Sequence, residues 1–371
     1  MSSSLQDEIF MREAIALSLT HLGRTGANPS VGCVIVKHGE IVGRGVTAEG
    51  GRPHAEPQAL AEAGTQSQGA TAYVTLEPCS HHGKTPPCAD AMIRAGVSRV
   101  VVAVADPDPR VSGQGLKMLA DAGIEVTIGI LQKEARFALS GYLMRQTRGR
   151  PQVTLKLAVS RDGMLGLRGA GQVRITGDAA REDVHRLRAE SDAILVGVGT
   201  AIADDPELTV RLPGLVHTSP LRIVLDRTYR LPLNSKLVRQ AQVVPTIVVG
   251  RAVPAAAGEG AAISARRTAL HDAGVECLDL SSLSDLLTDL AHRGISNLMV
   301  EGGAEVARAF LAAGLVDRLW LYQGNVTLGA DGIASPVVPD QAPLGFEVAE
   351  QRALGDDSLT IFRRQTIARY E

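Results

Sequence analysis

The sequence has little of several features that would place it in a special class of protein. Aromatic residues make up 3% of its 371 positions, and only four cysteines occur. No apolar run approaches the roughly 18 residues of a membrane-spanning helix, and four cysteines are too few for a disulfide framework. The formal net charge of −2 provides no basic field. We therefore expect neither a membrane protein nor a protein whose main partner is a nucleic-acid backbone.

What the chain does have is the composition of a globular protein, with 45% hydrophobic and 21% charged residues. Its length favours two domains over one, because a typical domain has roughly 150 residues. The opening residues MSSSLQDEIF lack the basic start and apolar run of a signal peptide, so we expect a cytoplasmic protein. A small anionic substrate is compatible with the charge, and we expect a homo-oligomer.

Helical and extended patterns alternate through the first part of the chain. A helix is expected over about 7–20, and the stretches 31–36 and 40–45 flank a turn and predict a hairpin. Helical patterns at 54–64, 88–96 and 113–123 alternate with strand patterns at 71–77, 99–106 and 124–129. This order predicts an α/β layered domain.

A second alternating series follows a boundary near Gly149. A helical pattern at 133–147 ends at the segment RGRP, where proline prevents the helix from continuing. Strand patterns then occur at 152–160, 193–198, 222–226, 246–250, 297–302 and 318–324. We expect one α/β domain over 1–148 and another over 149–371.

The segment EPCSHHGKTPPC, from Glu77 to Cys88, suggests a metal site together with His54 further upstream. The imidazole of His54 and the thiolates of Cys79 and Cys88 are three zinc ligands that leave a fourth position for water, which is typical of catalytic zinc. His81 or His82 would close the site if either were a fourth ligand. Glu56, two residues after His54, is suited to move protons without ligating.

This arrangement is the one found in zinc deaminases of nucleobases, in which metal-activated water attacks a ring carbon and a glutamate moves protons. Pro86 and Pro87 are expected to begin the helix that carries Cys88. The alternative is that the two cysteines are small buried hydrophobic residues, which their joint occurrence with His-x-Glu disfavours. Eight residues separate the cysteines, whereas the general deaminase signature has two.

The motifs HAE, TLEPCSHHGKTPPC and ADPDPRVSGQG together resemble the deaminase half of the bifunctional deaminase and reductase family of riboflavin biosynthesis. The later segments LKLAVSRDG, RAESDAILVGVGTAIADDPELTVR and LMVEGGAEVARAFLAAGLVDRL resemble its reductase half. The resemblance covers nearly the whole chain. It implies a cytidine-deaminase-like α/β/α domain followed by a dihydrofolate-reductase-like α/β domain.

For the first domain, the resemblance implies zinc-dependent deamination of a diaminopyrimidinone that bears a phosphoribosylamino group. Zinc would be bound by His54, Cys79 and Cys88, with Glu56 as catalytic residue. The implied substrate contacts are Asn28, Lys84, Thr85 and Asp106, and a lysine is a natural partner for a phosphate. Thr47 and Asp108 stand where the family often has histidine and asparagine, so the resemblance assigns no role to these two positions.

For the second domain, the resemblance implies NADPH-dependent reduction of the ribosyl group to ribityl, with Asp204 and Glu301 as catalytic residues. The implied NADPH contacts are Ala158, Arg174, Thr200, Asp204, Gly303, Ala304, Glu305, Val306, Ala307, Arg308 and Ala309. The implied substrate contacts are Gln172, Arg188, Leu208, Arg211 and Glu301. Gln172 and Arg174 stand where the best-known members have serine and tryptophan.

Without the resemblance, the residues of the second domain do not decide which α/β fold it has. GVGTAI is only part of a dinucleotide fingerprint, because Ile202 occupies the third glycine position. The two glycines of VEGGAEV would let a phosphate approach a helix start, although an ordinary strand-to-helix turn explains them as well.

Two other functions compete with the bifunctional enzyme. One is a zinc deaminase of free bases or tRNA that is fused to an unrelated α/β domain, for which a basic surface and a short cysteine spacer are expected. The other is a zinc-stabilised binding module without catalysis, in which Glu56 would have no role.

Overall fold

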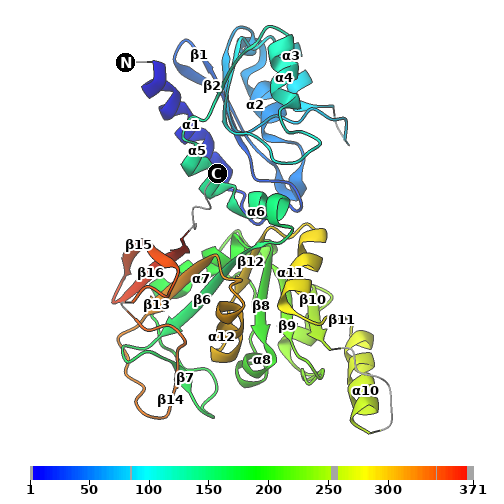
Figure 1. Cartoon of the computed structure of the whole chain (residues 1–371), viewed down its shortest axis with the longest axis vertical. Helices are drawn as coiled ribbons and strands as arrows, with labels where there is room; N and C mark the ends of the chain where they lie inside the picture. Colours follow the sequence, from blue (N-terminus) through cyan, green and yellow to red (C-terminus); the bar gives the residue numbers. More distant parts are fainter. Residues whose placement is uncertain (1–2, 84–85, 252–257, 340, 366–371) are drawn as a thin grey trace. The chain divides into compact units, whose positions relative to one another are not determined.

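The computed structural model describes residues 3–83, 86–251, 258–339 and 341–365. The chain forms two compact units, shown in Figure 1. The first comprises residues 1–150 and 291–296, and the second comprises residues 151–290 and 297–371. The main division thus follows Arg150, and no sequence pattern indicated that 291–296 groups with the first unit.

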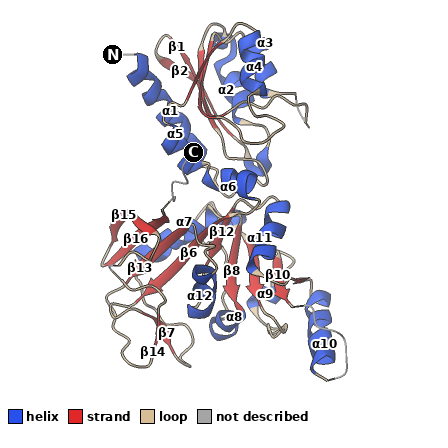
Figure 2. Ribbon diagram, viewed as in Figure 1, coloured by secondary structure: helices blue, strands red, loops and turns tan. Residues whose placement is uncertain are grey.

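The first unit is built on a five-stranded sheet of β1 (Gly32–Lys37), β2 (Glu40–Val46), β3 (Thr71–Leu76), β4 (Arg99–Val104) and β5 (Glu125–Ile128). The strand order is β2-β1-β3-β4-β5, in which β1 is antiparallel to both neighbours and β3, β4 and β5 are parallel. Its helices are α1 (Ser3–Leu19), α2 (Ala55–Ala63), α3 (Cys88–Arg94), α4 (Gln114–Asp121), α5 (Gln132–Ala138) and α6 (Ser140–Arg148). Helices α1 and α5 lie on one face of the sheet, and α2, α3 and α4 lie on the other (Figures 1 and 2). The expected layered α/β fold is confirmed.

Two glycines of β2 bring α2 close to the sheet. A Cβ atom at Gly43 would lie 2.1 Å from the carbonyl oxygen of Ala59, and one at Gly45 would lie 2.0 Å from that of Ala55. Any larger residue would push the helix away. The glycines therefore fix the position of the first turn of α2, which carries Glu56.

The single helix expected over 133–147 is in fact two helices. Helix α5 ends at Ala138 and α6 begins at Ser140, and Leu139 between them has φ −89° and ψ 5°, outside the helical range. The hydroxyl of Ser140 donates to the carbonyl oxygen of Phe137, 2.7 Å away. A serine followed by glycine is a common cause of such a break, and here it directs α6 away from the axis of α5.

The second unit contains a nine-stranded sheet of β6 (Gln152–Val159), β8 (Ala193–Gly197), β9 (Leu221–Leu225), β10 (Thr246–Gly250), β11 (Glu276–Asp279), β12 (Asn297–Val300), β13 (Arg318–Gln323), β15 (Phe346–Leu354) and β16 (Asp357–Arg364). The short strands β7 (Met164–Leu167) and β14 (Gly332–Ala334) pair separately. The helices are α7 (Asp178–Ala189), α8 (Val198–Asp204), α9 (Lys236–Arg239), α10 (Glu259–Asp272), α11 (Leu283–His292) and α12 (Ala304–Ala312).

The order of this sheet is β11-β10-β9-β8-β12-β6-β13-β16-β15. All neighbours from β11 to β13 are parallel, and the hairpin of β15 and β16 adds two antiparallel strands at one edge. The sequence patterns found six strands of this sheet, but they gave no sign of β15 and β16 or of the separately paired β7 and β14. The expected α/β class is confirmed, and the short α8 after β8 agrees with the incomplete dinucleotide fingerprint.

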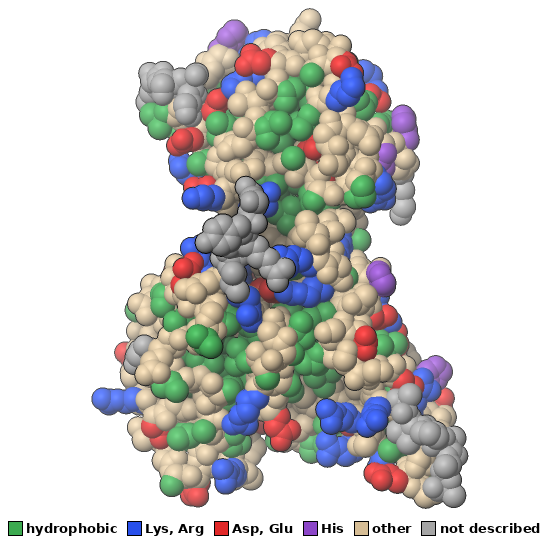
Figure 3. Space-filling model, viewed as in Figure 1, with side chains coloured by type: hydrophobic (Ala, Val, Ile, Leu, Met, Phe, Trp, Pro, Cys, Tyr) green, Lys and Arg blue, Asp and Glu red, His purple; other side chains and the backbone are tan. Residues whose placement is uncertain are grey.

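The surface of each unit carries charges of both signs on the face drawn in Figure 3. The cores consist mainly of aliphatic side chains from the sheets. Within the described ranges, the longest apolar stretches in helices fall short of what a bilayer crossing requires.

Candidate active sites

Three potential metal ligands meet in the first unit. His54 immediately precedes α2, Cys79 follows β3, and Cys88 is the first residue of α3. The Nδ1 atom of His54 lies 3.8 Å from the Sγ atom of Cys79 and 3.4 Å from that of Cys88. Ligand atoms about 2.0–2.3 Å from a tetrahedral zinc ion are about 3.5–3.8 Å apart. The cluster therefore has the dimensions of a zinc site.

The surroundings of Cys79 favour the thiolate form that metal binding requires, whereas the hydrogen bond to Cys79 and burial raise the pKa of Cys88. A hydrogen bond from the thiol of Cys88, together with one from His54, lowers the pKa of Cys79 to about 4. The backbone N–H of Cys88 also donates to Cys79 Sγ at 3.4 Å. The thiolate of Cys79 thus accepts a hydrogen bond from the N–H group at the start of α3, where negative charge is stabilised.

Glu56 lies in the first turn of α2, beside the cysteines, and only 4% of it is exposed. Burial and the negative charge of Cys79 raise the pKa of its carboxyl group. A raised pKa suits a group that must take up and release a proton near neutral pH.

A cavity of about 260 Å³ opens beside this cluster. Its lining includes Asn28, Thr47, Glu56, Asp106, Asp108 and Tyr142. Asp106 is 6% exposed, and burial raises its pKa. The cavity can therefore present amide and carboxylate groups to a polar ring held near the metal ligands.

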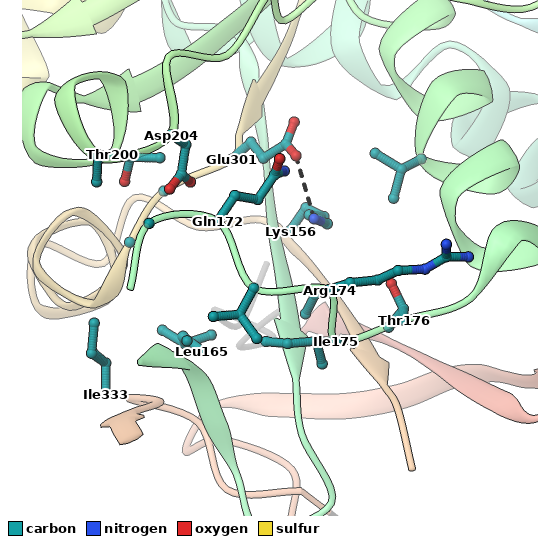
Figure 4. A pocket seen from close by; sticks show the side chains of 18 of the residues that line it. Lys156, Leu165, Gln172, Arg174, Ile175, Thr176, Thr200, Asp204, Glu301 and Ile333 are labelled. Atoms are coloured by element: carbon teal, nitrogen blue, oxygen red, sulfur yellow. Dashed lines mark hydrogen bonds and ion pairs between the residues drawn. The ribbon is translucent and has the colours of Figure 1, made fainter. Parts of the chain in front are cut away.

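The second unit has a larger cavity of about 710 Å³, shown in Figure 4. Glu301, which directly follows β12, lies in it between two cations. Its Oε1 atom is 3.3 Å from Lys156 Nζ, and its Oε2 atom is 2.8 Å from Arg188 Nη2. Burial acts to raise the pKa of Glu301, but the charges of Arg188 and Lys156 outweigh it and lower the pKa to about 2. Glu301 is thus a fixed anion.

The start of α12 forms another wall of this cavity. Gly302 and Gly303 line the cavity with Thr200. A Cβ atom at Gly302 would lie 2.9 Å from Val306 Cβ, and one at Gly303 would lie 3.1 Å from Thr200 Oγ1. The glycines allow this close packing, and they place the start of α12 at the cavity wall, where helix N–H groups favour a phosphate.

Asp204 and His185 also line this cavity, and the pKa values of both are shifted. Burial and the charge of Glu301 raise the pKa of Asp204. Burial and the nearby charges of Arg188 and Arg211 lower the pKa of His185 to about 4, so this imidazole is neutral at pH 7.

The comparisons with known proteins agree for both units. Residues 4–104 match the cytidine and deoxycytidylate deaminase zinc-binding region, and residues 151–360 match the RibD C-terminal domain. The riboflavin biosynthesis protein RibD of Aquifex aeolicus is 39% identical over 366 residues, which cover 96% of this chain and 98% of that protein. The chain belongs to the RibD family.

Solved structures of RibD proteins lead to the same result. RibD of Acinetobacter baumannii has a TM-score of 0.88 and 39% identity, and the match covers 98% of this chain and 100% of that one. A Thermotoga maritima protein has a TM-score of 0.84 and 32% identity, covering 97% and 99%. That protein is named as a diaminohydroxyphosphoribosylaminopyrimidine deaminase and 5-amino-6-(5-phosphoribosylamino)uracil reductase. The present chain is accordingly a bifunctional deaminase and reductase of riboflavin biosynthesis, and fusion of a base or tRNA deaminase to an unrelated domain is not favoured.

Most residues that resemblance to the RibD family selects in the first unit lie together. Asn28, His54, Glu56, Cys79 and Asp106 line the smaller cavity, and Cys88 contacts His54 and Cys79 behind it. Lys84 and Thr85 lie outside the described residues.

In the second unit the selected residues divide into two groups. Those that line the larger cavity are Ala158, Gln172, Arg174, Arg188, Thr200, Asp204, Arg211, Glu301, Gly303 and Ala304. Leu208 does not line it, because its side chain is 3% exposed and packs in the hydrophobic core. The residues that continue α12 also lie outside its lining: Glu305, Val306, Ala307, Arg308 and Ala309. Of α12, Ala304 alone lines the cavity, and Ala307 is fully buried.

The structure adds residues that the sequence did not suggest. Lys156 reaches the RibD reductase cavity, and the one signal for it is a charge in the otherwise apolar part of strand β6, TLKLAV. His185 lines the same cavity from α7. Tyr142 reaches the deaminase cavity from α6, and no local pattern distinguishes it.

Proposed function

We propose that the first unit hydrolytically deaminates 2,5-diamino-6-(5-phosphoribosylamino)pyrimidin-4-one and that the second unit reduces the ribosyl group of the product to ribityl with NADPH. The observation that carries this proposal is the presence of two cavities with opposite chemistry in one chain. One holds a buried glutamate of raised pKa beside a His-Cys-Cys cluster, and the other holds a glutamate fixed as an anion beside an open helix start.

In the deaminase unit, we assign His54, Cys79 and Cys88 to zinc, since their separations fit tetrahedral coordination. Zinc, when bound, supplies Lewis-acid activation of the attacking water. Glu56 takes up the proton of that water and passes it to the amino nitrogen, so that a carbon–oxygen bond replaces the carbon–nitrogen bond and ammonia leaves. Asp106 accepts a hydrogen bond from the pyrimidine ring and orients it. We propose Asn28, Lys84 and Thr85 as the further substrate contacts.

In the reductase unit, we assign the start of α12 and Thr200 to the phosphates of NADPH, because the glycine-lined helix start fits an anion. NADPH, when bound, supplies the hydride. The reduction also needs a proton, which the ammonium group of Lys156 is placed to donate inside the cavity. Glu301 holds that ammonium group in place by its ion pair, and Asp204 orients the ribosyl end.

We propose Arg211 and Arg188 for the substrate phosphate, because a guanidinium group pairs well with phosphate oxygens. Gln172 and Arg174 are proposed as substrate and cofactor contacts at the mouth of the same cavity. Ala158 is a further cofactor contact. Contacts of Leu208 and of Glu305 to Ala309, which do not line the cavity, stay predictions from the family resemblance. The cytoplasmic location and the homo-oligomeric state stay predictions.

The test is to incubate the full chain, loaded with zinc, with the diaminopyrimidinone phosphate and to identify the products. Without NADPH, we expect ammonia and the phosphoribosylaminouracil to appear in equal amounts. With NADPH, we expect the ribityl compound and one NADP⁺ for each molecule formed, at a higher rate than with NADH. Failure to release ammonia, or oxidation of NADPH without a ribityl product, would overturn the assignment of the corresponding unit.

A further inference from the structure

A tyrosine hydroxyl holds the carboxylate of Asp106 in the deaminase cavity. Tyr142, on α6, donates its hydrogen bond to Asp106, with its oxygen 2.9 Å from Oδ1 and 3.1 Å from Oδ2. The two residues are only 7% and 6% exposed. Burial and the charge of Asp106 raise the pKa of Tyr142, so the hydroxyl keeps its proton and remains a donor.

The backbone on which Asp106 lies is fixed separately by Glu77. The N–H group of Asp106 donates to Glu77 Oε2 at 3.2 Å, and the N–H groups of Gly113 and Gly115 donate to the same carboxylate at 3.1 Å each. Glu77 is 3% exposed and precedes Cys79 by two residues. The loop that carries Asp106 is therefore tied to the segment that carries a metal ligand.

With the loop fixed, the orientation of the Asp106 carboxylate still depends on its side-chain torsions. The N–H group of Asp108 donates to Oδ1 at 2.9 Å and restrains that oxygen. Tyr142 restrains both oxygens from a different element. A carboxylate has about four acceptor positions, so these donors leave acceptor capacity for a ligand in the cavity.

We propose that Tyr142 is a positioning residue for deamination, which acts by holding Asp106 in the orientation that accepts a hydrogen bond from the pyrimidine ring. This rests on the proposed function, in which Asp106 contacts the substrate. Tyr142 itself need not touch the substrate. Loss of its hydroxyl would leave Asp106 free to turn and would weaken binding before the chemical step.

The test compares two Tyr→Phe variants of the zinc-loaded full chain. Tyr142→Phe removes the proposed donor. Tyr73→Phe is the matched control, since Tyr73 is 4% exposed in the same unit and its hydroxyl donates to Asp7 Oδ1 at 2.8 Å, outside the lining of the deaminase cavity. The two changes remove the same group from a similar hydrogen bond to a buried carboxylate.

For Tyr142→Phe we expect the KM for deamination to rise on the order of tenfold, with kcat within about threefold, because a hydrogen bond to a charged group is lost. For Tyr73→Phe we expect both constants to stay within about twofold. Zinc content and reduction of the deaminated compound should be unchanged in both. A KM for Tyr142→Phe within twofold of the wild-type value, or equal losses in the two variants, would overturn the proposal.

A double-mutant cycle with Asp106→Ala distinguishes positioning from general packing. The deamination rate is measured in single turnovers, with enzyme in excess over substrate but below saturation. If Tyr142 acts through Asp106, adding Tyr142→Phe to the Asp106→Ala variant should change this rate by less than twofold. If the double variant instead lost activity by the product of the two single losses, Tyr142 would not act through Asp106. A wild-type chain that bound zinc but did not deaminate would overturn the proposed function instead.

Discussion

Each unit has a glutamate in its cavity, and the pKa values of the two glutamates are shifted in opposite directions. Glu56 is almost fully buried, and burial with the nearby charge of Cys79 raises its pKa. The side chain of Glu301 is 19% exposed, yet the charges of Arg188 and Lys156 overcome desolvation and lower its pKa to about 2. Burial alone therefore does not decide the protonation of a glutamate; its charged partners do.

The difference in pKa suits the two glutamates to different roles in catalysis. A carboxyl group of raised pKa can exchange a proton during each turnover, as the deaminase reaction requires. A carboxylate fixed between two cations cannot, but it can hold an ammonium group in place. Widely separated environments for two titratable groups thus indicate their separate roles.

The largest difference between the two activities is expected when the thiolates of Cys79 and Cys88 are removed. In Cys79→Ser with Cys88→Ser, zinc should be lost and deamination should fall below detection, because hydroxyl groups are poor zinc ligands. Reduction of the deaminated compound should stay within about twofold. The measurements are metal analysis and the two activity assays.

Cys277→Ser is the control for that double variant, because Cys277 is a free cysteine of the second unit. It should keep one zinc per chain and both activities. Stoichiometric zinc in the double variant would show that the His-Cys-Cys cluster is not the metal site.

A smaller effect is expected from loss of the lysine beside Glu301. Lys156→Met should slow reduction on the order of a hundredfold, because it removes the proposed proton donor from the cavity. Deamination should be unchanged. Lys236→Met, at the start of α9 and outside the cavity lining, is the control and should retain reduction within about twofold. Equal rates for the two lysine variants would refute the role of Lys156.

The smallest effect concerns stability and pH. Glu301 has a folded-state pKa of about 2 against an ordinary value of 4.5, so the unfolded state binds more protons between these values. Its contribution is therefore fully present above about pH 4.5 and is lost as the pH falls towards 2. The depression corresponds to about 3 kcal/mol in the free energy of unfolding.

Urea unfolding of wild type and Glu301→Gln measures this contribution. The single tryptophan, Trp320, lies on β13, so its fluorescence reports on the second unit. The stability difference between the two proteins should be greatest near pH 6 and should shrink as the pH falls from 4.5 to 3. A difference that does not vary with pH would mean that Glu301 is not held as an anion by its partners.

The metal cluster could be predicted because two of its residues lie at the beginnings of helices, and the sequence indicates where those helices begin. His54 and Glu56 flank the beginning of one helical pattern, and Cys88 follows two prolines at the beginning of another. Local spacing therefore carried most of the information. The break at Leu139 was not predicted, because the helical periodicity of 133–147 runs through it.

The partners of Glu301 could not be predicted, because they depend on strand order. β12 pairs with β6 in parallel, with Val300 opposite Leu155, so the residues that follow, Glu301 and Lys156, are neighbours although 145 positions separate them. Periodicity identifies strands but does not say which strands pair. Tyr142 was missed for a similar reason, since its contact with Asp106 joins a loop and a helix 36 positions apart.

The most direct test of the central claim, that the two carboxylates serve two separate reactions, is a crossed assay of Glu56→Gln and Glu301→Gln with both substrates. Glu56→Gln should keep its zinc and its reductase activity, and its deamination should fall by about 10²- to 10⁴-fold, because an amide cannot carry the proton. Glu301→Gln should deaminate normally and should be impaired in reduction. Deamination by Glu56→Gln within a few-fold of wild type, or loss of both activities in either variant, would contradict the account.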